Sequence, residues 1–379
     1  MTKTPKNAPI LVIAPADGRG GIASVIRLHA QTEVWRTKGC QLLSTYDDRS
    51  SRRKIVAALK AYCVAPTAIY RAGIVHVHLA GQKSVLRKLP LILLAKLFRK
   101  PMIVHVHAFS VESLFDNTAL SAGKWALRHA DRVIALSQTW ADAINARDQS
   151  LRLSVIPNPV SASPTKVRPV GREPVILFAG KLEQRKGYQD LLAAAVPVLR
   201  SYPAAQFWFA GHGDVEIAAM MAETLGVRGS VRFMGWLNVD AMSSAYEDAT
   251  IFCLPSYNEG VPMVVLEAMG RGLPVVCTKV GGLPDYIEHD RNGLFAVAGD
   301  PVSIAESLLQ LLDDPAKSNR MGEEAAKTIH ATCSLDAISK QLHQLYEEIS
   351  RSQSRAAGTR HHSDATGIAS REAVNHLES

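Results

Sequence analysis

The chain has 379 residues, more than one hydrophobic core usually serves, so we expect two domains of ordinary size. Its composition, 47% hydrophobic and 21% charged, is typical of a folded globular protein rather than a fibrous, disordered or membrane-embedded one. The net charge of +8 favours an anionic partner, but charge alone does not choose among a nucleotide sugar, an acidic membrane and nucleic acid.

Two further features concern the cellular compartment. The five cysteines lie far apart and form no C-x-x-C pair, which favours a reducing cytoplasm over a disulfide framework. The longest apolar stretch, Leu89 to Phe98, is interrupted by Lys96 and falls well short of the ~20 residues that a spanning helix needs. We therefore expect a cytoplasmic protein without a membrane-spanning helix.

Short apolar, β-branched runs alternate with helix-length amphipathic segments along almost the whole chain, which is typical of helices wound around a parallel sheet. The first half predicts strands at Ile10–Ala14, Gln41–Thr45, Ile74–His78, Met102–His107, Arg132–Leu136 and Ser154–Ile156. The second half predicts strands at Pro174–Ala179, Gln206–Ala210, Ser230–Met234, Thr250–Leu254, Pro274–Thr278 and Gly293–Val297.

Prolines and glycines accumulate between the two series of strands, so residues 161–173 are interpreted as a linker. The fold class is therefore α/β, with two doubly wound Rossmann-like domains, residues 1–160 and 174–333, whose strand-to-helix loops face each other across a cleft. We expect residues 334–350 to form a C-terminal helix. Whether this helix crosses back to the first domain stays open. Residues 351–379 are rich in Ser, Arg and His and are expected to be disordered.

The first informative loop, Gly18-Arg19-Gly20-Gly21-Ile22-Ala23, follows the first strand and opens a helix. The lack of side chains at Gly20 and Gly21 lets backbone N–H groups approach a diphosphate, and the helix N-terminus favours its charge. The spacing is not that of the dinucleotide fingerprint. A tight strand-to-helix turn explains the glycines equally well, so both interpretations stay open.

Two His-x-His segments end neighbouring predicted strands: His76-Val77-His78 and His105-Val106-His107. Side chains alternate along a strand, so the two histidines of each pair share one face of the sheet. Strand-end histidines are usually structural, and no carboxylate motif completes a ligand set, so we expect no metal site. His107, next to the following loop, is best placed to reach the cleft.

Cations follow the first strand of the second domain, in the segment Gly180-Lys181-Leu182-Glu183-Gln184-Arg185-Lys186-Gly187. Lysines held at a strand end can neutralise the charge that gathers on a departing diphosphate. A solvated basic loop is the alternative for a charge cluster by itself.

The strongest signal is the segment from Pro255 to Gly270, in which a loop carries Glu259 and the following helix carries Glu267. Two such carboxylates can accept hydrogen bonds from the hydroxyls of a hexose and of a ribose. The helix is expected to begin near Pro262, where the backbone at Val261, Pro262, Met263 and Val264 is available to a phosphate.

At this segment the sequence resembles the retaining glycosyltransferases of family four, whose hallmark is two glutamates separated by seven residues. Other landmarks follow in order over most of residues 8–350: Gly20-Gly21-Ile22, His107, Ser137, Ile156-Pro157-Asn158-Pro159, Gly180-Lys181, Lys186-Gly187, Phe209-Ala210-Gly211-His212-Gly213, Phe233-Met234-Gly235 and Gly281-Gly282. The resemblance implies the two-domain GT-B architecture and transfer of a hexosyl unit from a nucleotide diphosphate sugar to a glycan acceptor.

The resemblance also implies roles for single residues. Glu259 would contact the hydroxyls of the donor sugar, Glu267 the ribose, and Lys186 the diphosphate, with Gly20 and Gly21 on the diphosphate from the other domain. Gly211 would belong to the donor site. Lys181 stands where the family commonly has arginine, so the charge remains but bidentate phosphate contact is lost. His107 would face the donor sugar and the acceptor, and its role as a proton carrier is a hypothesis. The implied mechanism needs neither a metal nor another cofactor.

The acceptor side is assigned to the first domain. Lysines and arginines interleave with leucines from Lys83 to Lys100, as in an interfacial helix that meets anionic lipid headgroups, although an ordinary core-facing helix fits as well. Residues 76–100 resemble members that build exopolysaccharide or lipopolysaccharide, which favours a lipid-linked acceptor at the inner face of the cell membrane.

Three other functions compete with this interpretation. A sugar-nucleotide epimerase of the same architecture would also bind a nucleotide diphosphate, and a non-catalytic nucleotide-sugar-binding protein would keep the fold. Nucleic-acid binding ranks last because basic residues do not interleave with aromatic ones.

Overall fold

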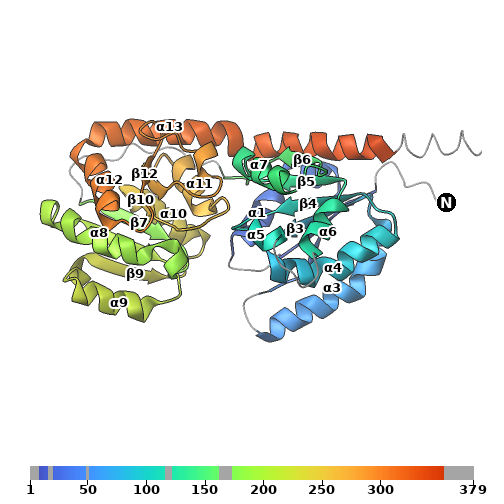
Figure 1. Cartoon of the computed structure of the whole chain (residues 1–379), viewed down its shortest axis with the longest axis horizontal. Coiled ribbons are helices and arrows are strands. Elements are labelled where there is room, and N and C mark those ends of the chain that lie inside the picture. The colour runs from blue at the N-terminus through green and yellow to red at the C-terminus, as the bar shows by residue number, and fades with distance from the viewer. Residues whose placement is uncertain (1–7, 16–19, 48–50, 116–121, 162–172, 354–379) are drawn as a thin grey trace, which may run out of the picture.

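A computed structural model describes residues 8–15, 20–47, 51–115, 122–161 and 173–353 of the protein. Two parallel six-stranded sheets form the centres of two domains that lie side by side (Figure 1). The predicted α/β class with two doubly wound domains is confirmed. Each of the twelve predicted strands coincides with an observed strand to within one or two residues.

The first sheet has the order β2-β1-β3-β4-β5-β6, so the chain changes direction in the sheet between β1 and β3. Its strands are β1 (Ile10–Ala14), β2 (Gln41–Ser44), β3 (Ile74–Leu79), β4 (Met102–Val106), β5 (Arg132–Ala135) and β6 (Leu153–Val155). Its helices are α1 (Gly21–His29), α2 (Glu33–Thr37), α3 (Ser51–Arg71), α4 (Gln82–Leu97), α5 (Glu112–Phe115), α6 (Ala122–Arg128) and α7 (Gln138–Arg147). In a doubly wound sheet, ligands bind beyond the strand ends at such a reversal.

The second sheet has the order β12-β11-β10-β7-β8-β9 and reverses between β7 and β10. Its strands are β7 (Val175–Ala179), β8 (Gln206–Ala210), β9 (Val231–Gly235), β10 (Ile251–Leu254), β11 (Val275–Thr278) and β12 (Leu294–Ala296). Its helices are η1 (Gln184–Lys186), α8 (Tyr188–Ser201), α9 (Val215–Thr224), η2 (Arg228–Ser230), α10 (Val239–Asp248), α11 (Met263–Gly270), η3 (Leu283–Asp285), α12 (Pro301–Asp313) and α13 (Pro315–Cys333). The reversal places the loops after β7 and β10 next to each other.

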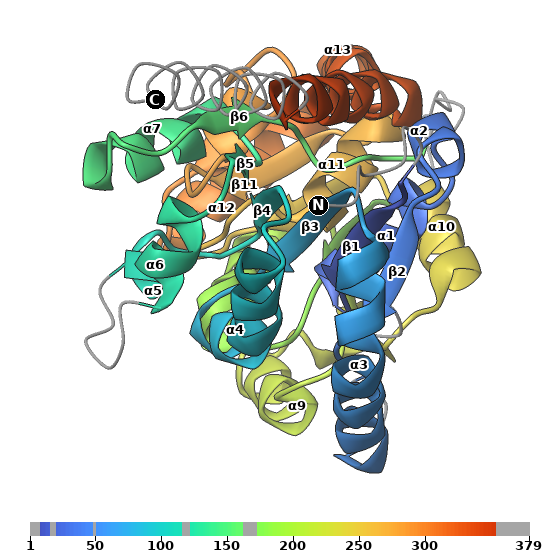
Figure 2. The same ribbon diagram turned by 90° about the vertical axis from the view of Figure 1, so that its right-hand side faces the viewer.

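The last helix, residues 335–353, leaves the second domain and packs on the sheet of the first (Figures 1 and 2). Its buried side chains recur at helical spacing at Ile338, Leu342, Leu345 and Ile349, and they join one apolar cluster with β1, including Val12. The helix continues through residue 353, so the expectation of disorder is wrong for residues 351–353. Residues 354–379 of the expected tail, and most of the expected linker, lie outside the described residues.

Two boundaries differ from prediction in ways that matter for the site. Strand β4 ends at Val106, so His107 is the first residue of the following loop instead of the last residue of the strand. Helix α11 begins at Met263 with Pro262 as its N-cap. Among the helices of the described residues, none combines the length and the apolar character needed to cross a bilayer.

Candidate functional site

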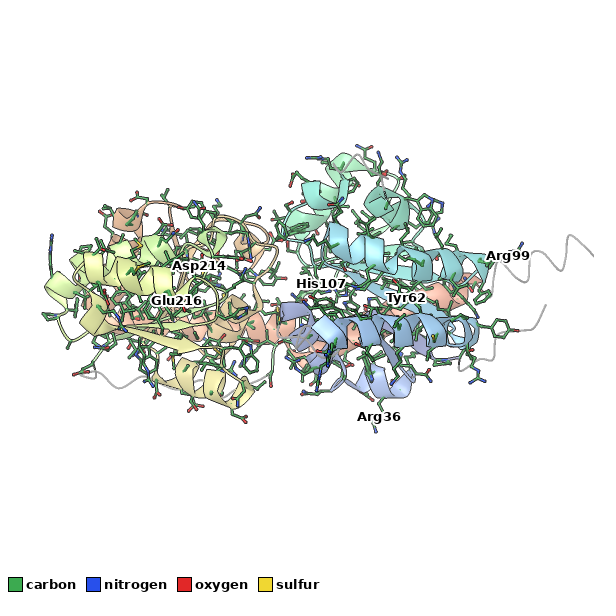
Figure 3. The ribbon with its side chains drawn as sticks, turned by 90° about the horizontal axis from the view of Figure 1, so that it is seen from below. Arg36, Tyr62, Arg99, His107, Asp214 and Glu216 are labelled. Atoms are coloured by element: carbon green, nitrogen blue, oxygen red, sulfur yellow. The ribbon has the colours of Figure 1, made fainter. Side chains whose placement is uncertain are left out.

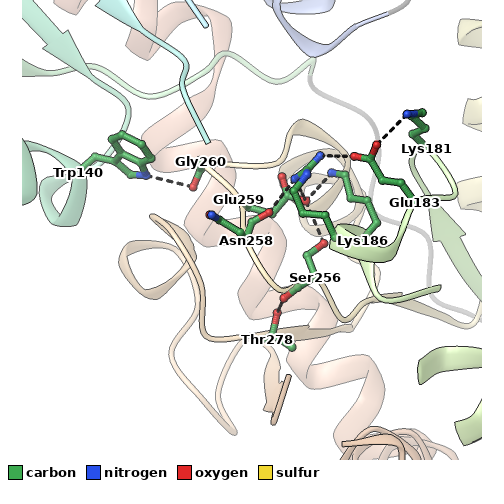
Figure 4. Close-up of polar contacts among 10 residues, drawn as sticks. Trp140, Lys181, Glu183, Lys186, Ser256, Asn258, Glu259, Gly260 and Thr278 are labelled. Carbon is green, nitrogen blue, oxygen red and sulfur yellow. Dashed lines mark hydrogen bonds and ion pairs between the residues drawn. The ribbon is translucent and has the colours of Figure 1, made fainter. Parts of the chain in front are cut away.

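Glu259 and Lys186 are brought together where the second sheet reverses. Lys186 lies in the loop after β7 and Glu259 in the loop after β10, and these strands are neighbours. The Lys186 Nζ atom lies 2.5 Å from Glu259 Oε1, which also accepts a 2.9 Å hydrogen bond from the Ser256 hydroxyl (Figure 4). Glu259 is only 6% exposed. The carboxylate is therefore held in one orientation by a cation and a hydroxyl.

Arg185 is a third member of this group, which the sequence reasoning did not select. Its guanidinium lies 3.4 Å from Glu259 Oε1 and donates hydrogen bonds of 2.7 Å to the Asn258 carbonyl and to Glu183. It also lies over the Phe109 ring of the first domain, 5.5 Å from its centroid. In the sequence, the position of Arg185 next to Lys186 in the same basic segment could have indicated this role. Only the fold shows that both cations reach Glu259.

Close backbone packing fixes the two loops against each other. Gly187 adopts a left-handed φ of +69°, and a Cβ atom there would lie 2.0 Å from the Pro255 carbonyl oxygen. The Tyr257 N–H group donates a 2.8 Å hydrogen bond to the Arg185 carbonyl. Gly187 therefore serves both a strained turn and a close approach, which only glycine allows.

Lys181 stands apart from Glu259. Its amine pairs with Glu183 Oε2 at 2.9 Å, and its side chain is 53% exposed. Glu183 also binds Arg185, so this carboxylate links the two cations. The structure thus separates the two predicted lysines: Lys186 contacts Glu259 directly, whereas Lys181 lies one ion pair further out.

Glu267 forms a second, separate acidic position on α11. Its Oε2 atom accepts a 3.0 Å hydrogen bond from the Tyr246 hydroxyl. Burial raises the pKa of Glu267, while Tyr246 and the charges of Arg271 and Arg27 act in the opposite direction. Because Arg27 belongs to α1, a positive charge of the first domain lowers the pKa of this carboxylate in the second domain. Glu259 and Glu267 therefore offer acceptors at two different points.

The start of α11 faces the glycine loop of the first domain. A Cβ atom on Gly21 would lie 3.8 Å from the Met263 side chain, whereas one on Gly20 would meet open space. The first helical hydrogen bonds run from Val265 and Leu266 to the Pro262 carbonyl. The N–H groups of Val261, Met263 and Val264 therefore precede the helical ladder, as expected of a phosphate-binding helix start.

Direct contacts hold the Glu259 loop against the first domain. The Trp140 indole N–H donates a 3.3 Å hydrogen bond to the Gly260 carbonyl, which Figure 4 also shows. Asp285 accepts hydrogen bonds of 2.8 and 2.6 Å from the backbone and side chain of Thr139. The loop that carries Glu259 therefore lies at the junction between the two domains.

Gly211 has a packing role that the structure makes plain. It is buried at the end of β8, and a Cβ atom there would lie 1.7 Å from the Gly180 carbonyl oxygen. Any side chain would push apart the loops that follow β7 and β8. Its predicted contact with the donor stays a prediction.

His107 lies at the edge of the first domain that faces the second (Figure 3). Its Nε2 atom is 2.8 Å from His78 Nδ1, so one ring donates a hydrogen bond to the other. Burial holds the pKa of His107 well below its usual value, with further lowering by His29 and Lys88. The ring is therefore neutral at physiological pH, and its engaged Nε2 atom leaves Nδ1 for other partners.

Two successive family models match the chain. Residues 8–163 match the model described as glycosyltransferase family 4, and residues 161–328 match the model described as glycosyl transferases group 1. The chain belongs to glycosyltransferase family four. The order of the two matches follows the two domains of the fold.

Individual relatives extend the comparison. The D-inositol 3-phosphate glycosyltransferase of Corynebacterium jeikeium is 36% identical over 186 residues, which are 47% of this chain and 44% of that protein. The chain thus spans less than half the length of this curated relative.

Solved structures share the fold at lower identity. HepE of Anabaena, solved with UDP and glucose, has a TM-score of 0.73 at 19% identity, and the alignment covers 90% of this chain and 100% of the HepE chain. The lipopolysaccharide outer core galactosyltransferase WaaB has a TM-score of 0.65 at 21% identity, covering 90% of this chain and 99% of its own. These likenesses confirm the GT-B fold.

Proposed function

We propose that the protein is a retaining glycosyltransferase that moves a hexosyl unit from a nucleotide diphosphate sugar to a glycan acceptor in cell-surface polysaccharide synthesis. The observation that carries the proposal is the buried Glu259 carboxylate, held between Lys186 and Arg185 at the junction of the two domains. Cations and a carboxylate at one point suit a ligand that joins a diphosphate to a sugar.

The proposed binding mode assigns the negative end of the donor to the cations. An ammonium group has three hydrogen-bond donors, so Lys186 can keep Glu259 and still bind a diphosphate oxygen. The backbones of Gly20 and Gly21 and the start of α11 would bind the same diphosphate from two sides. Glu259 would accept hydrogen bonds from the sugar, and Glu267 from the ribose.

The proposed chemistry uses the donor's own diphosphate. As the bond to the anomeric carbon breaks, negative charge gathers on the leaving oxygen, and Lys186 and Arg185 lie where they can stabilise it. The leaving diphosphate then accepts the proton of the incoming acceptor hydroxyl on the same face of the sugar, so the configuration is retained. The proposal needs no metal for this step.

The known proteins support the substrate class. HepE was solved with UDP and glucose, and WaaB is described as a lipopolysaccharide galactosyltransferase. The ligands and names of these related structures therefore support a nucleotide sugar donor and a glycan acceptor. We further propose that the acceptor is lipid-linked and lies at the cytoplasmic face of the membrane.

A donor panel tests the proposed reaction. UDP- and GDP-hexoses would be incubated with the purified chain and cell-membrane extract, with nucleotide release and product anomers measured by NMR. We expect one donor to be consumed in the presence of acceptor and the product to keep the donor's anomeric configuration. An inverted product would overturn retention, an epimerised donor without transfer would support the epimerase, and binding without turnover would support the non-catalytic alternative.

The structure changes the predicted membrane surface. Lys88 is not exposed: it is fully buried, its amine donates a hydrogen bond to the His78 carbonyl, and burial lowers its pKa to about 7. Neutralising Lys88 would therefore disturb the core instead of testing lipid binding. Helices α3 and α4, which contact each other, instead expose large apolar side chains: Ile55, Val56, Leu59, Leu86, Leu93 and Leu97.

Exposed basic residues lie on the same two helices as these apolar side chains. Arg52, Arg53, Lys54 and Lys60 are exposed on α3, and Lys83 and Lys96 are exposed on α4, with Arg99 just beyond its end. Exposed apolar side chains on helices that also carry lysines and arginines suit insertion among anionic lipid headgroups. We propose this face of α3 and α4 as the membrane-contacting surface.

Neutralising Lys83, Lys96 and Arg99 together should weaken binding to anionic liposomes about 100-fold, since each charge contributes roughly 1 kcal/mol near the surface. Sedimentation with phosphatidylglycerol vesicles measures the effect. The matched control neutralises three exposed cations of the second domain: Arg200, Lys279 and Arg320. Equal binding by both triple variants would remove the proposed surface.

A further inference from the structure

Five histidines lie together in the first domain, and we call them the histidine cluster: His76 and His78 on β3, His105 on β4, His107 just after β4 and His29 at the end of α1. Residues His76 and His78 alternate on β3, and His78 pairs in register with His105 on β4. Neighbouring ring centroids lie 4.3 to 6.2 Å apart. The other residues of the sheet face that carries His76, His78 and His105 are the apolar side chains that pack on the last helix.

Three of these histidines have the placement of a metal-binding set. Their ligand atoms, one each from His76, His78 and His105, all lie within 4.8 Å of one another, and the three residues are buried. Two histidines at i and i+2 on one strand, with a third opposite on the next, direct three imidazoles to one side of a sheet. The three rings lie at interplanar angles of 9 to 31°, so they would have to turn about their side-chain torsions to bring the atoms to the roughly 3.3 Å spacing of a tetrahedral zinc site.

The hydrogen bonds of the cluster leave nitrogens available. The Nδ1 atom of His76 is bonded to the Tyr346 hydroxyl at 2.8 Å, and the Nδ1 atom of His78 to His107 at 2.8 Å. Within the described chain, His76 Nε2 and both nitrogens of His105 are buried without a hydrogen-bond partner. Buried polar atoms in native proteins are nearly always satisfied. Zinc-bound histidines typically have their second nitrogen hydrogen-bonded, as the Nδ1 atoms of His76 and His78 are here, whereas neither nitrogen of His105 has a partner among the described residues.

We propose, in contrast to the expectation from the sequence alone, that His76, His78 and His105 bind a first-row transition metal ion, with Zn²⁺ the preferred ion. Imidazole nitrogens suit zinc, whereas magnesium and calcium require oxygen ligands. A water molecule would complete the tetrahedron, as in other sites with three histidine ligands. The proposed transfer step does not use the ion, whose link to the site runs through the hydrogen bond between His78 and His107.

The position of the ion gives it a structural role. Through His76 it would hold Tyr346, and with it the last helix, on the first sheet. Through His78 it would hold the ring of His107 at the domain junction. A bound ion would therefore stabilise the return of the chain to the first domain and the orientation of one site residue.

The test measures metal directly in the full-length chain. The protein would be unfolded in chelator, refolded with Zn²⁺ or Co²⁺, freed of unbound metal by gel filtration and assayed for metal content. We expect one equivalent of Zn²⁺ to be retained, a visible absorption band of tetrahedral Co²⁺, and a higher Tm with metal than without. His105→Asn should lose all three.

Two matched variants control for other histidines. His343→Ala removes an exposed histidine of the last helix, and a double alanine variant removes His361 and His362, which could bind metal on their own. Both variants should retain one equivalent of Zn²⁺ and show the absorption band of tetrahedral Co²⁺. No retained metal in the wild type, or equal retention by the wild type and a folded His105→Asn variant, would overturn the proposal, whatever the transfer activity.

Discussion

Replacing Glu259 by alanine should lower sugar transfer at least about 10³-fold while the protein stays folded. The carboxylate is 6% exposed and bound by Lys186 and Ser256, so its oxygens are oriented before any donor arrives. Its loss removes the acceptor proposed for the sugar hydroxyls and leaves the lysine without its partner. We expect a cost of up to about 3–5 kcal/mol in the free energy of unfolding, within the roughly 5–15 kcal/mol by which folded proteins are stable.

The measurement is kcat/KM with the donor identified by the panel, alongside denaturant unfolding. Glu259→Gln separates charge from shape, because the amide retains a hydrogen-bond acceptor for Ser256 but not the negative charge. It should remain at least about 10²-fold impaired. Glu306→Ala removes an exposed glutamate of α12 and should leave turnover unchanged. Wild-type turnover by a folded Glu259→Ala protein would refute the assignment.

Replacing Lys186 by alanine should lower transfer about 10²–10⁴-fold, and mainly through kcat. The ammonium lies at the junction, 2.5 Å from Glu259, with only 13% of its side chain exposed. If it stabilises the charge that develops on the leaving diphosphate, its effect is larger in the transition state than in the bound donor. Arg185, 3.4 Å from Glu259, retains part of the positive charge, so the activity should fall without vanishing.

Calorimetry of donor binding distinguishes this role from simple attraction. A variant that binds the donor nearly as well as the wild type but turns it over slowly fits charge stabilisation, whereas equal losses in affinity and kcat/KM indicate uniform binding. Lys340→Ala, an exposed lysine on the last helix, is the matched control. Should Lys186→Ala turn over like the wild type, the leaving-group assignment would have to be abandoned.

The sequence by itself determined the secondary structure and the general location of the site. Short apolar, β-branched runs predicted all twelve strands, because strands buried on both faces leave a continuous hydrophobic signal. Glycine and proline marked the loops for the same local reason. Glu259 and Lys186 were identifiable because each lies in a loop that follows a strand, where parallel sheets gather their functional residues. Glu267, inside α11, was identified by its spacing from Glu259.

Only the tertiary structure decided which side chains meet. Arg185 and Glu259 are far apart in sequence, and they meet because β7 and β10 became neighbours in the second sheet. The burial of Lys88 and the return of the last helix to the first sheet likewise depend on packing between distant segments. Local patterns record how each element folds, but contacts across a reversed sheet or between domains depend on the strand order, which no single segment encodes.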